Sequence, residues 1–96
     1  MKKWDETTRL MWYFLLEIFC FYAHFPDPMQ PHQFTSFSNS ILVMQNILLQ
    51  EEAREKISAK DKEDIIDSCL EYLDEKWENC PSLVKGRLLN LILVVK

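Results

Sequence analysis

Glycine is nearly absent from this sequence, with Gly86 alone among 96 residues. Phosphate-binding loops, dinucleotide-binding turns and tight β-hairpins need glycine at fixed positions, so the sequence excludes these structures. Cysteine is scarce too: the three cysteines are odd in number and lack C-x-x-C spacing. This usage is typical of a reducing compartment rather than of a disulfide framework, and it predicts a cytoplasmic protein.

The composition is that of an ordinary globular domain. Hydrophobic residues make up 48% of the chain and charged residues 27%, which is close to the average for soluble folds and too apolar for intrinsic disorder. A chain of this length suits one domain. We therefore predict a single helical domain over residues 1–96.

The longest apolar stretch, residues 10–25, has Glu17 in its middle. It is shorter than the roughly 20 apolar residues that a membrane-spanning helix needs. Basic residues precede it, as in a secretory signal peptide, but Ala23-His24-Phe25 is a poor cleavage site. We expect a buried helix here and keep a membrane-associated helix as a less favoured alternative.

The first predicted helix spans residues 6–23, with Asp5 as its N-cap and no glycine or proline inside it. A helix that is apolar on nearly all sides is usually enclosed by other helices, so we expect it at the centre of a bundle. Its continuous apolar face consists of Met11, Leu15, Ile18, Tyr22 and Phe25. Prolines at positions 26, 28 and 31 then predict a stiff loop over residues 25–32.

Three further helices are predicted after this loop. Counted along the chain, the second helix begins within residues 35–38 and ends near residue 56. The third helix begins at Ser58. The fourth spans residues 82–96, with Ser82 as its N-cap. The buried stripe of the third helix is predicted to be Ile66, Leu70, Leu73 and Trp77. A strand over residues 88–95 is the alternative, although the chain offers it no strand partner. The predicted fold is an all-α, compact four-helix domain with a proline-rich loop after the first helix.

Acidic residues are concentrated in one part of the chain. Residues 51–79 carry eleven acids and five bases, a net charge of −6, whereas residues 80–96 carry three bases and no acid. Six acids share one predicted helix face: Asp64, Asp67, Glu71, Asp74, Glu75 and Glu78. Such a stripe is typical either of a docking surface for a basic protein or of a solvated face that keeps the protein soluble. Because it would repel phosphates, nucleic acid is not an expected partner.

Twelve aromatic residues are more than the core of so small a domain needs. Most of them are expected in the core. Trp4 and Tyr13 are instead predicted to anchor an interface, because Trp and Tyr contribute strongly to binding energy.

Neither a metal site nor a catalytic site is predicted. A zinc set can be drawn from His24, His32, Cys69 and Cys80, but without the spacing of known zinc motifs. Cys20 and His24 lie four residues apart, yet burial in an aromatic helix keeps a thiol protonated and inert. We therefore expect a protein that is not an enzyme and holds no cofactor or metal.

In size, acidity, low glycine content and lack of a catalytic constellation, the chain resembles the small acidic immunity proteins of bacterial toxin–immunity systems, including those of contact-dependent growth inhibition. That resemblance implies a bacterial inhibitor of a cognate toxin, often a nuclease with a basic cleft, held by the acidic stripe. The alternative hypothesis is a helical scaffold or homo-oligomer subunit that packs through the aromatic first helix.

Overall fold

The computed structural model describes residues 4–26 and 28–96. These residues form five α-helices, one 3-10 helix and no strand: α1 (Glu6–Ala23), α2 (Pro31–Leu48), α3 (Glu51–Lys56), α4 (Ala59–Lys76), η1 (Trp77–Asn79) and α5 (Ser82–Val95). The predicted all-α class is confirmed. The strand alternative for residues 88–95 is wrong, because this segment completes α5.

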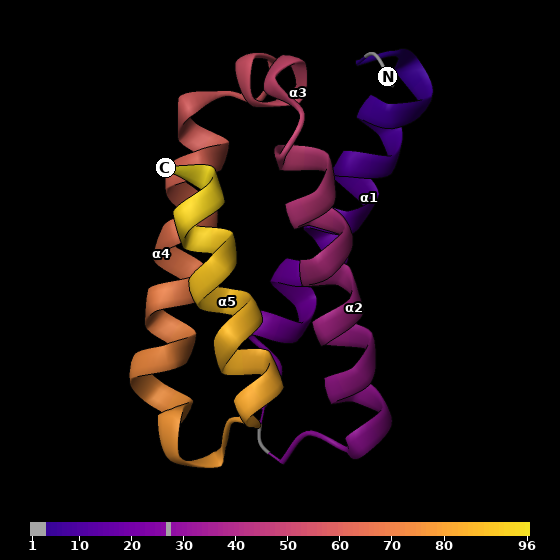
Figure 1. The fold of residues 1–96 in the computed structure, drawn as a ribbon. Helices are drawn as coiled ribbons and strands as arrows, with labels where there is room; N and C mark the ends of the chain where they lie inside the picture. Colours follow the sequence, from indigo (N-terminus) through magenta and orange to yellow (C-terminus); the bar gives the residue numbers. More distant parts are fainter. Residues whose placement is uncertain (1–3, 27) are drawn as a thin grey trace.

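The four long helices lie side by side, and α3 covers one end of the bundle (Figure 1). The helix α2 packs against both α1 and α5, α5 packs against α4, and the contact between α1 and α4 is the smallest of these. The bundle measures 37 × 23 × 19 Å. The helices α2 and α5 each pack closely against two long helices, whereas α1 packs closely against α2 alone, so α1 does not occupy the centre of the bundle.

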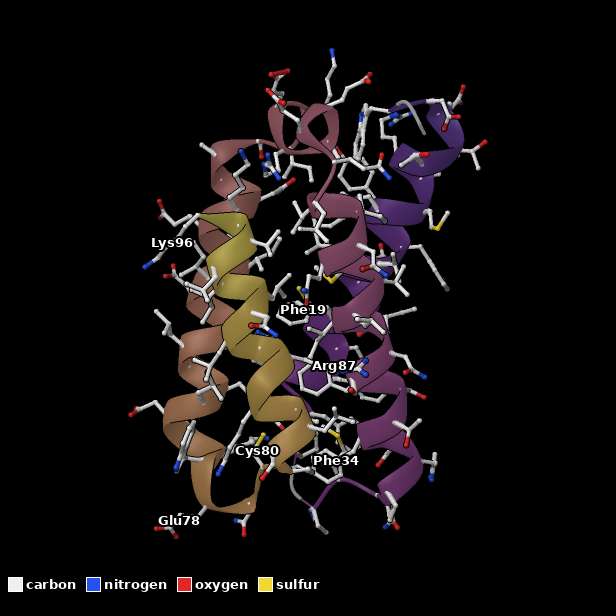
Figure 2. The ribbon with its side chains drawn as sticks, in the orientation of Figure 1. Phe19, Phe34, Glu78, Cys80, Arg87 and Lys96 are labelled. Carbon is white, nitrogen blue, oxygen red and sulfur yellow. The ribbon has the colours of Figure 1, made fainter. Side chains whose placement is uncertain are left out.

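The core is built around Phe37 of α2, which is fully buried. Its ring lies 5.9 Å from that of Phe19, 6.0 Å from that of Tyr22 and 5.1 Å from that of Tyr72. These separations are typical of favourable aromatic pairs. Phe37 therefore joins α1, α2 and α4, and Figure 2 shows Phe19 within the bundle.

The second predicted helix is wrong at both ends. Its first turn begins at Pro31, where proline suits the helix start because its missing N–H would have no partner there. At this start the Gln30 N–H donates to Gln33 Oε1 at 2.7 Å, and the Gln33 N–H donates to the Gln30 carbonyl oxygen at 2.9 Å. The helix stops at Leu48, and the extended backbone of Gln50 leads into the separate helix α3. The described chain thus has five α-helices instead of four, and the loop ends before Pro31.

Arg54 stabilises the break between α2 and α3. Its Nη1 donates a hydrogen bond to the carbonyl oxygen of Leu48, at 2.9 Å. The last carbonyls of a helix lack partners within the helix, so this side chain supplies one from the next helix. No glycine or proline marks the break, which is why the sequence pattern suggested one continuous helix.

The bounds and the N-cap of α1 agree with the prediction, and the Thr8 N–H donates to the Asp5 carboxylate at 2.8 Å. Its predicted central position is wrong. The buried residues form a narrower stripe: Thr8, Trp12, Leu15, Phe19 and Ala23. Met11, from the predicted face, is 41% exposed. The structure therefore encloses one side of α1 and leaves uncovered the opposite side, which is apolar except for Glu17.

The predicted buried stripe of α4 is wrong at two positions. Ser58 does cap the helix by accepting a hydrogen bond from the Asp61 N–H at 3.1 Å. However, Leu70 is 52% and Trp77 49% exposed. The buried residues of α4 are Ile65, Cys69, Tyr72 and Leu73. This set also has helical spacing, and the aromatic contact between Tyr72 and Phe37 favours it.

The start of α5 differs by one residue from the prediction. Pro81 occupies the N-cap position, and Ser82 is the first residue of the helix, so the Ser82 side chain does not cap it. Proline is compatible with this position, where no intrahelical N–H is needed. The buried residues of α5 are Val84, Leu88, Leu91, Ile92 and Val95.

Candidate protein-interaction surface

The uncovered side of α1 is an apolar strip. Leu10 is 56%, Phe14 63% and Phe21 60% exposed. Together with the exposed Glu17 they follow i, i+4, i+7 and i+11, so the four side chains share one side of the helix. We call Leu10, Phe14, Glu17 and Phe21 the outer face of α1. Single exposed apolar residues are common on proteins, but a contiguous row of them is typical of an interaction site.

A groove of about 550 Å³ runs beside the outer face, between α1 and α2. We call it the α1/α2 groove. It is lined by Phe14, Leu15, Glu17, Ile18, Phe21 and Tyr22 of α1 and by Ser36, Asn39, Ser40 and Val43 of α2. The α1 side is mainly aromatic and aliphatic, whereas the α2 side is mainly small and polar.

The charge of this surface is set by one residue. The helix α2 contains no Asp, Glu, Lys or Arg, and Glu17 is the charged residue in the lining of the groove. The hydroxyl of Ser40 donates to the Phe37 carbonyl at 2.7 Å, so it is already partnered within its own helix. Ser36 and Asn39 are exposed and supply neutral polar groups along the edge.

Neighbouring rings hold Phe21 in place at one end of the outer face. The Phe21 ring lies edge-on to Tyr22 at 5.2 Å and to Phe25 at 5.4 Å. Such edge-to-face contacts are favourable and limit the orientations of an exposed ring. The aromatic end of the groove is therefore preorganised to receive an apolar side chain.

The acidic residues predicted from the sequence lie on α4 and η1 and are all exposed: Asp64, Asp67, Glu71, Asp74, Glu75 and Glu78. Lys60 Nζ lies 3.2 Å from Asp64 Oδ2, and His24 Nδ1 lies 4.0 Å from Glu71 Oε1. Within residues 4–26 and 28–96, the other four acids form no ion pair. Figure 2 shows Glu78 beyond the end of the bundle. None of the six lines the α1/α2 groove.

The two predicted aromatic anchors occupy different environments. Trp4 is half-buried and packs against the core beside α1. Tyr13 is 45% exposed but does not line the groove. The prediction did not select Phe14, Glu17 or Phe21. Their regular spacing was present in the sequence, but α1 has apolar residues on nearly every side, so that spacing did not stand out.

The three cysteines are free thiols held in their protonated form. Burial raises the pKa of Cys69 from 9.0 to about 12. Burial also raises the pKa of Cys20, with a smaller contribution from the Asp64 carboxylate, and that of Cys80, where the Lys85 ammonium opposes the effect. Since the thiolate is the nucleophile, these surroundings disfavour cysteine chemistry.

In the part of the chain that the structure describes, no group of three or more His, Cys, Asp or Glu residues is placed to hold a metal ion. A search of the same residues found no helix with both the length and the hydropathy needed to cross a bilayer. Comparisons with protein-family models, with curated proteins and with solved structures gave no match to this chain.

Proposed function

We propose that this chain is a non-catalytic protein-interaction module that holds its partner at the α1/α2 groove. The observation that carries the proposal is the joint exposure of Leu10, Phe14 and Phe21 on one side of α1. A fully buried aromatic side chain accounts for about 150–250 Å². At the exposed fractions given above, these three residues and Met11 together leave roughly 400 Å² of apolar surface uncovered. A patch of this size is comparable to the functional patches of monomeric proteins.

Partner binding tests this proposal. The tagged protein is used to recover its partner from the source cells, and the purified pair is then measured by calorimetry. Phe14→Ala and Phe21→Ala should each weaken binding by about 30-fold, as expected of central aromatic residues at an interface. The matched control is Leu93→Ala on α5, which removes a side chain that is 71% exposed but outside the groove.

The control should bind like the unaltered protein. Equal affinities of all three variants would place the interface elsewhere. A loss of affinity in the control as large as in the two phenylalanine variants would show that the groove has no special part in binding.

The acidic surface of α4 and η1 supports a second candidate function, that of an inhibitor or immunity protein for a basic, nuclease-type toxin. All six acids are exposed, and in the described structure Asp64 lies near the Lys60 ammonium and Glu71 near the His24 imidazole. A field of one sign accelerates association with an oppositely charged partner and weakens as salt screens it. On this hypothesis the six carboxylates occupy the place of nucleic-acid phosphates in the basic cleft of the toxin.

Charge reversal separates the two candidate functions. Asp67→Lys combined with Glu71→Lys should lower the association rate of a basic partner about tenfold at low salt and leave the fold intact. Phe14→Ala should then have little effect. If binding depends on Phe14 and is insensitive both to the double charge reversal and to salt, the groove is the binding site, and the acidic residues only keep the protein soluble.

A further inference from the structure

We infer that the α1/α2 groove takes an amphipathic helix that carries a lysine or arginine opposite Glu17. This inference rests on the proposed function and adds to it the shape and the charge of the bound segment. Two observations carry it: the spacing of the exposed residues on α1, and the single charge within an otherwise neutral groove.

The spacing determines the shape of the occupant. Leu10, Phe14, Glu17 and Phe21 are separated by steps of four, three and four residues. This alternation is the seam that one helix presents to another in helix–helix packing. From Leu10 to Phe21 the seam rises by eleven residue steps, about 17 Å at the helical rise of 1.5 Å per residue, so it matches roughly three turns of a partner helix. The groove beside it is flanked by α2, which runs antiparallel to α1 (Figure 1).

The charge of the occupant follows from Glu17. A helix that covers Phe14 and Phe21 also covers the carboxylate between them and removes it from water. An unpaired buried carboxylate is strongly unfavourable, whereas a cation brought by the partner offsets the lost hydration. Among residues 4–26 and 28–96, no Lys, Arg or His lines the groove beside Glu17. Arg9 and His24 lie eight and seven residues away along α1, about 12 and 10 Å by helical rise, and α2 is free of basic Lys and Arg.

The same charge argues against a second copy of this chain as the occupant. An antiparallel pair of α1 helices, centred on the outer face, places Leu10 opposite Phe21 and Phe14 opposite Glu17. The two Glu17 carboxylates then lie within about one helical turn of each other in a closed seam. A parallel pair places them directly opposite. Either arrangement buries two like charges without a cation and is therefore disfavoured.

The test uses the intact protein and three synthetic helical peptides of 16 residues as probes. Each peptide has leucine along one seam, and they differ in the residue at the centre of that seam: lysine, glutamine or glutamate. Binding is measured by fluorescence anisotropy. The unaltered protein should bind the lysine peptide at least about tenfold more tightly than the glutamate peptide. Glu17→Lys should reverse this order, and Glu17→Gln should remove the preference.

Controls distinguish a failure of this inference from a failure of the proposed function. If Phe14→Ala weakens the binding of all three peptides, but the order of their affinities does not depend on residue 17, the groove binds a helix without a preference for a basic residue. If none of the peptides binds at millimolar concentration, or if Phe14→Ala changes nothing, the proposed function fails as well.

Two further measurements test the other occupants of an apolar face. Sedimentation of the protein alone should show a monomer, and a dimer that Phe21→Ala dissociates would overturn the inference in favour of a second copy. Co-sedimentation with vesicles of phosphatidylcholine and phosphatidylserine should leave the protein in solution. Vesicle binding that Phe14→Ala abolishes, without any peptide binding, would overturn it in favour of a membrane surface.

Discussion

Two phenylalanines on α1, two residues apart, provide the most direct test of how this helix is oriented. Phe19 is fully buried and packs against Phe37, whereas Phe21 is 60% exposed and faces away from the core. Phe19→Ala and Phe21→Ala remove the same atoms from the same helix. Their effects on intrinsic helix propensity are therefore equal, and any difference in the free energy of unfolding reports burial alone.

The structure gives the expected magnitudes. Truncation of a buried phenylalanine to alanine lowers the free energy of unfolding by about 3–5 kcal/mol, because the cost of a cavity adds to the lost transfer free energy. Truncation of Phe21 removes a side chain of which less than half is buried, so we expect about 1 kcal/mol. A domain of this length is stable by roughly 5–14 kcal/mol. Phe19→Ala thus removes a large share of the stability and Phe21→Ala a small one.

Urea unfolding, followed by circular dichroism at 222 nm, measures both variants. With an m-value of about 1.5 kcal/mol per molar urea, Phe19→Ala should lower the midpoint by about 2–3 M and Phe21→Ala by less than 1 M. The m-values of the two variants should agree with that of the unaltered protein. Equal shifts, or a larger shift for Phe21→Ala, would mean that α1 is rotated about its axis and that the outer face and the α1/α2 groove do not exist as described.

Three further predictions concern stability. The pKa of Cys69 is about 12 in the folded protein and near 9 in the unfolded protein. Above pH 9 the unfolded state therefore loses a proton that the folded state keeps, and the free energy of unfolding should fall by about 1 kcal/mol between pH 8 and pH 10. Urea titrations should show a smaller fall for Cys69→Ala. Ser38 is 3% exposed, and its Oγ has no hydrogen-bond partner among the described residues. Ser38→Ala should therefore raise the melting temperature by a few degrees. A lower melting temperature would reveal a hydrogen bond to this hydroxyl. Ser58→Ala removes the N-cap of α4 and should destabilise the protein by about 1 kcal/mol in thermal unfolding, while Ser58→Asp should retain the stability of the original residue.

The helix starts show how far local signals reach. Asp5 precedes a run without glycine or proline, and Ser58 has Asp61 three residues on in capping-box position, so the sequence predicts a helix start at each. Both side chains accept the expected hydrogen bonds. The break at Leu49–Gln50 has no such signal. At this break the Arg54 guanidinium, on α3, donates to the Leu48 carbonyl, at the end of α2, and the local sequence does not predict such a contact between two helices.

The exposed positions of α4 have a similar explanation. Leu70 and Trp77 fit an apolar stripe as well as Ile65 and Tyr72 do, so spacing alone does not choose between the two sets. Contact with the core makes the choice, since the Tyr72 ring packs on Phe37. The Trp77 ring then lies outside the core, with the Lys85 ammonium 4.1 Å from its centre.

The sequence by itself determined the all-α class, the bounds of α1, the start of α4 and the separation of acidic from basic segments, because capping residues, prolines and charge act over a few neighbouring positions. Only the tertiary structure decided which side of α1 is buried. Both sides of that helix carry large apolar side chains, and the outer side also carries the Glu17 carboxylate. The Phe19 ring packs on Phe37 of α2, and this leaves Phe14, Glu17 and Phe21 on the outside as the candidate binding surface.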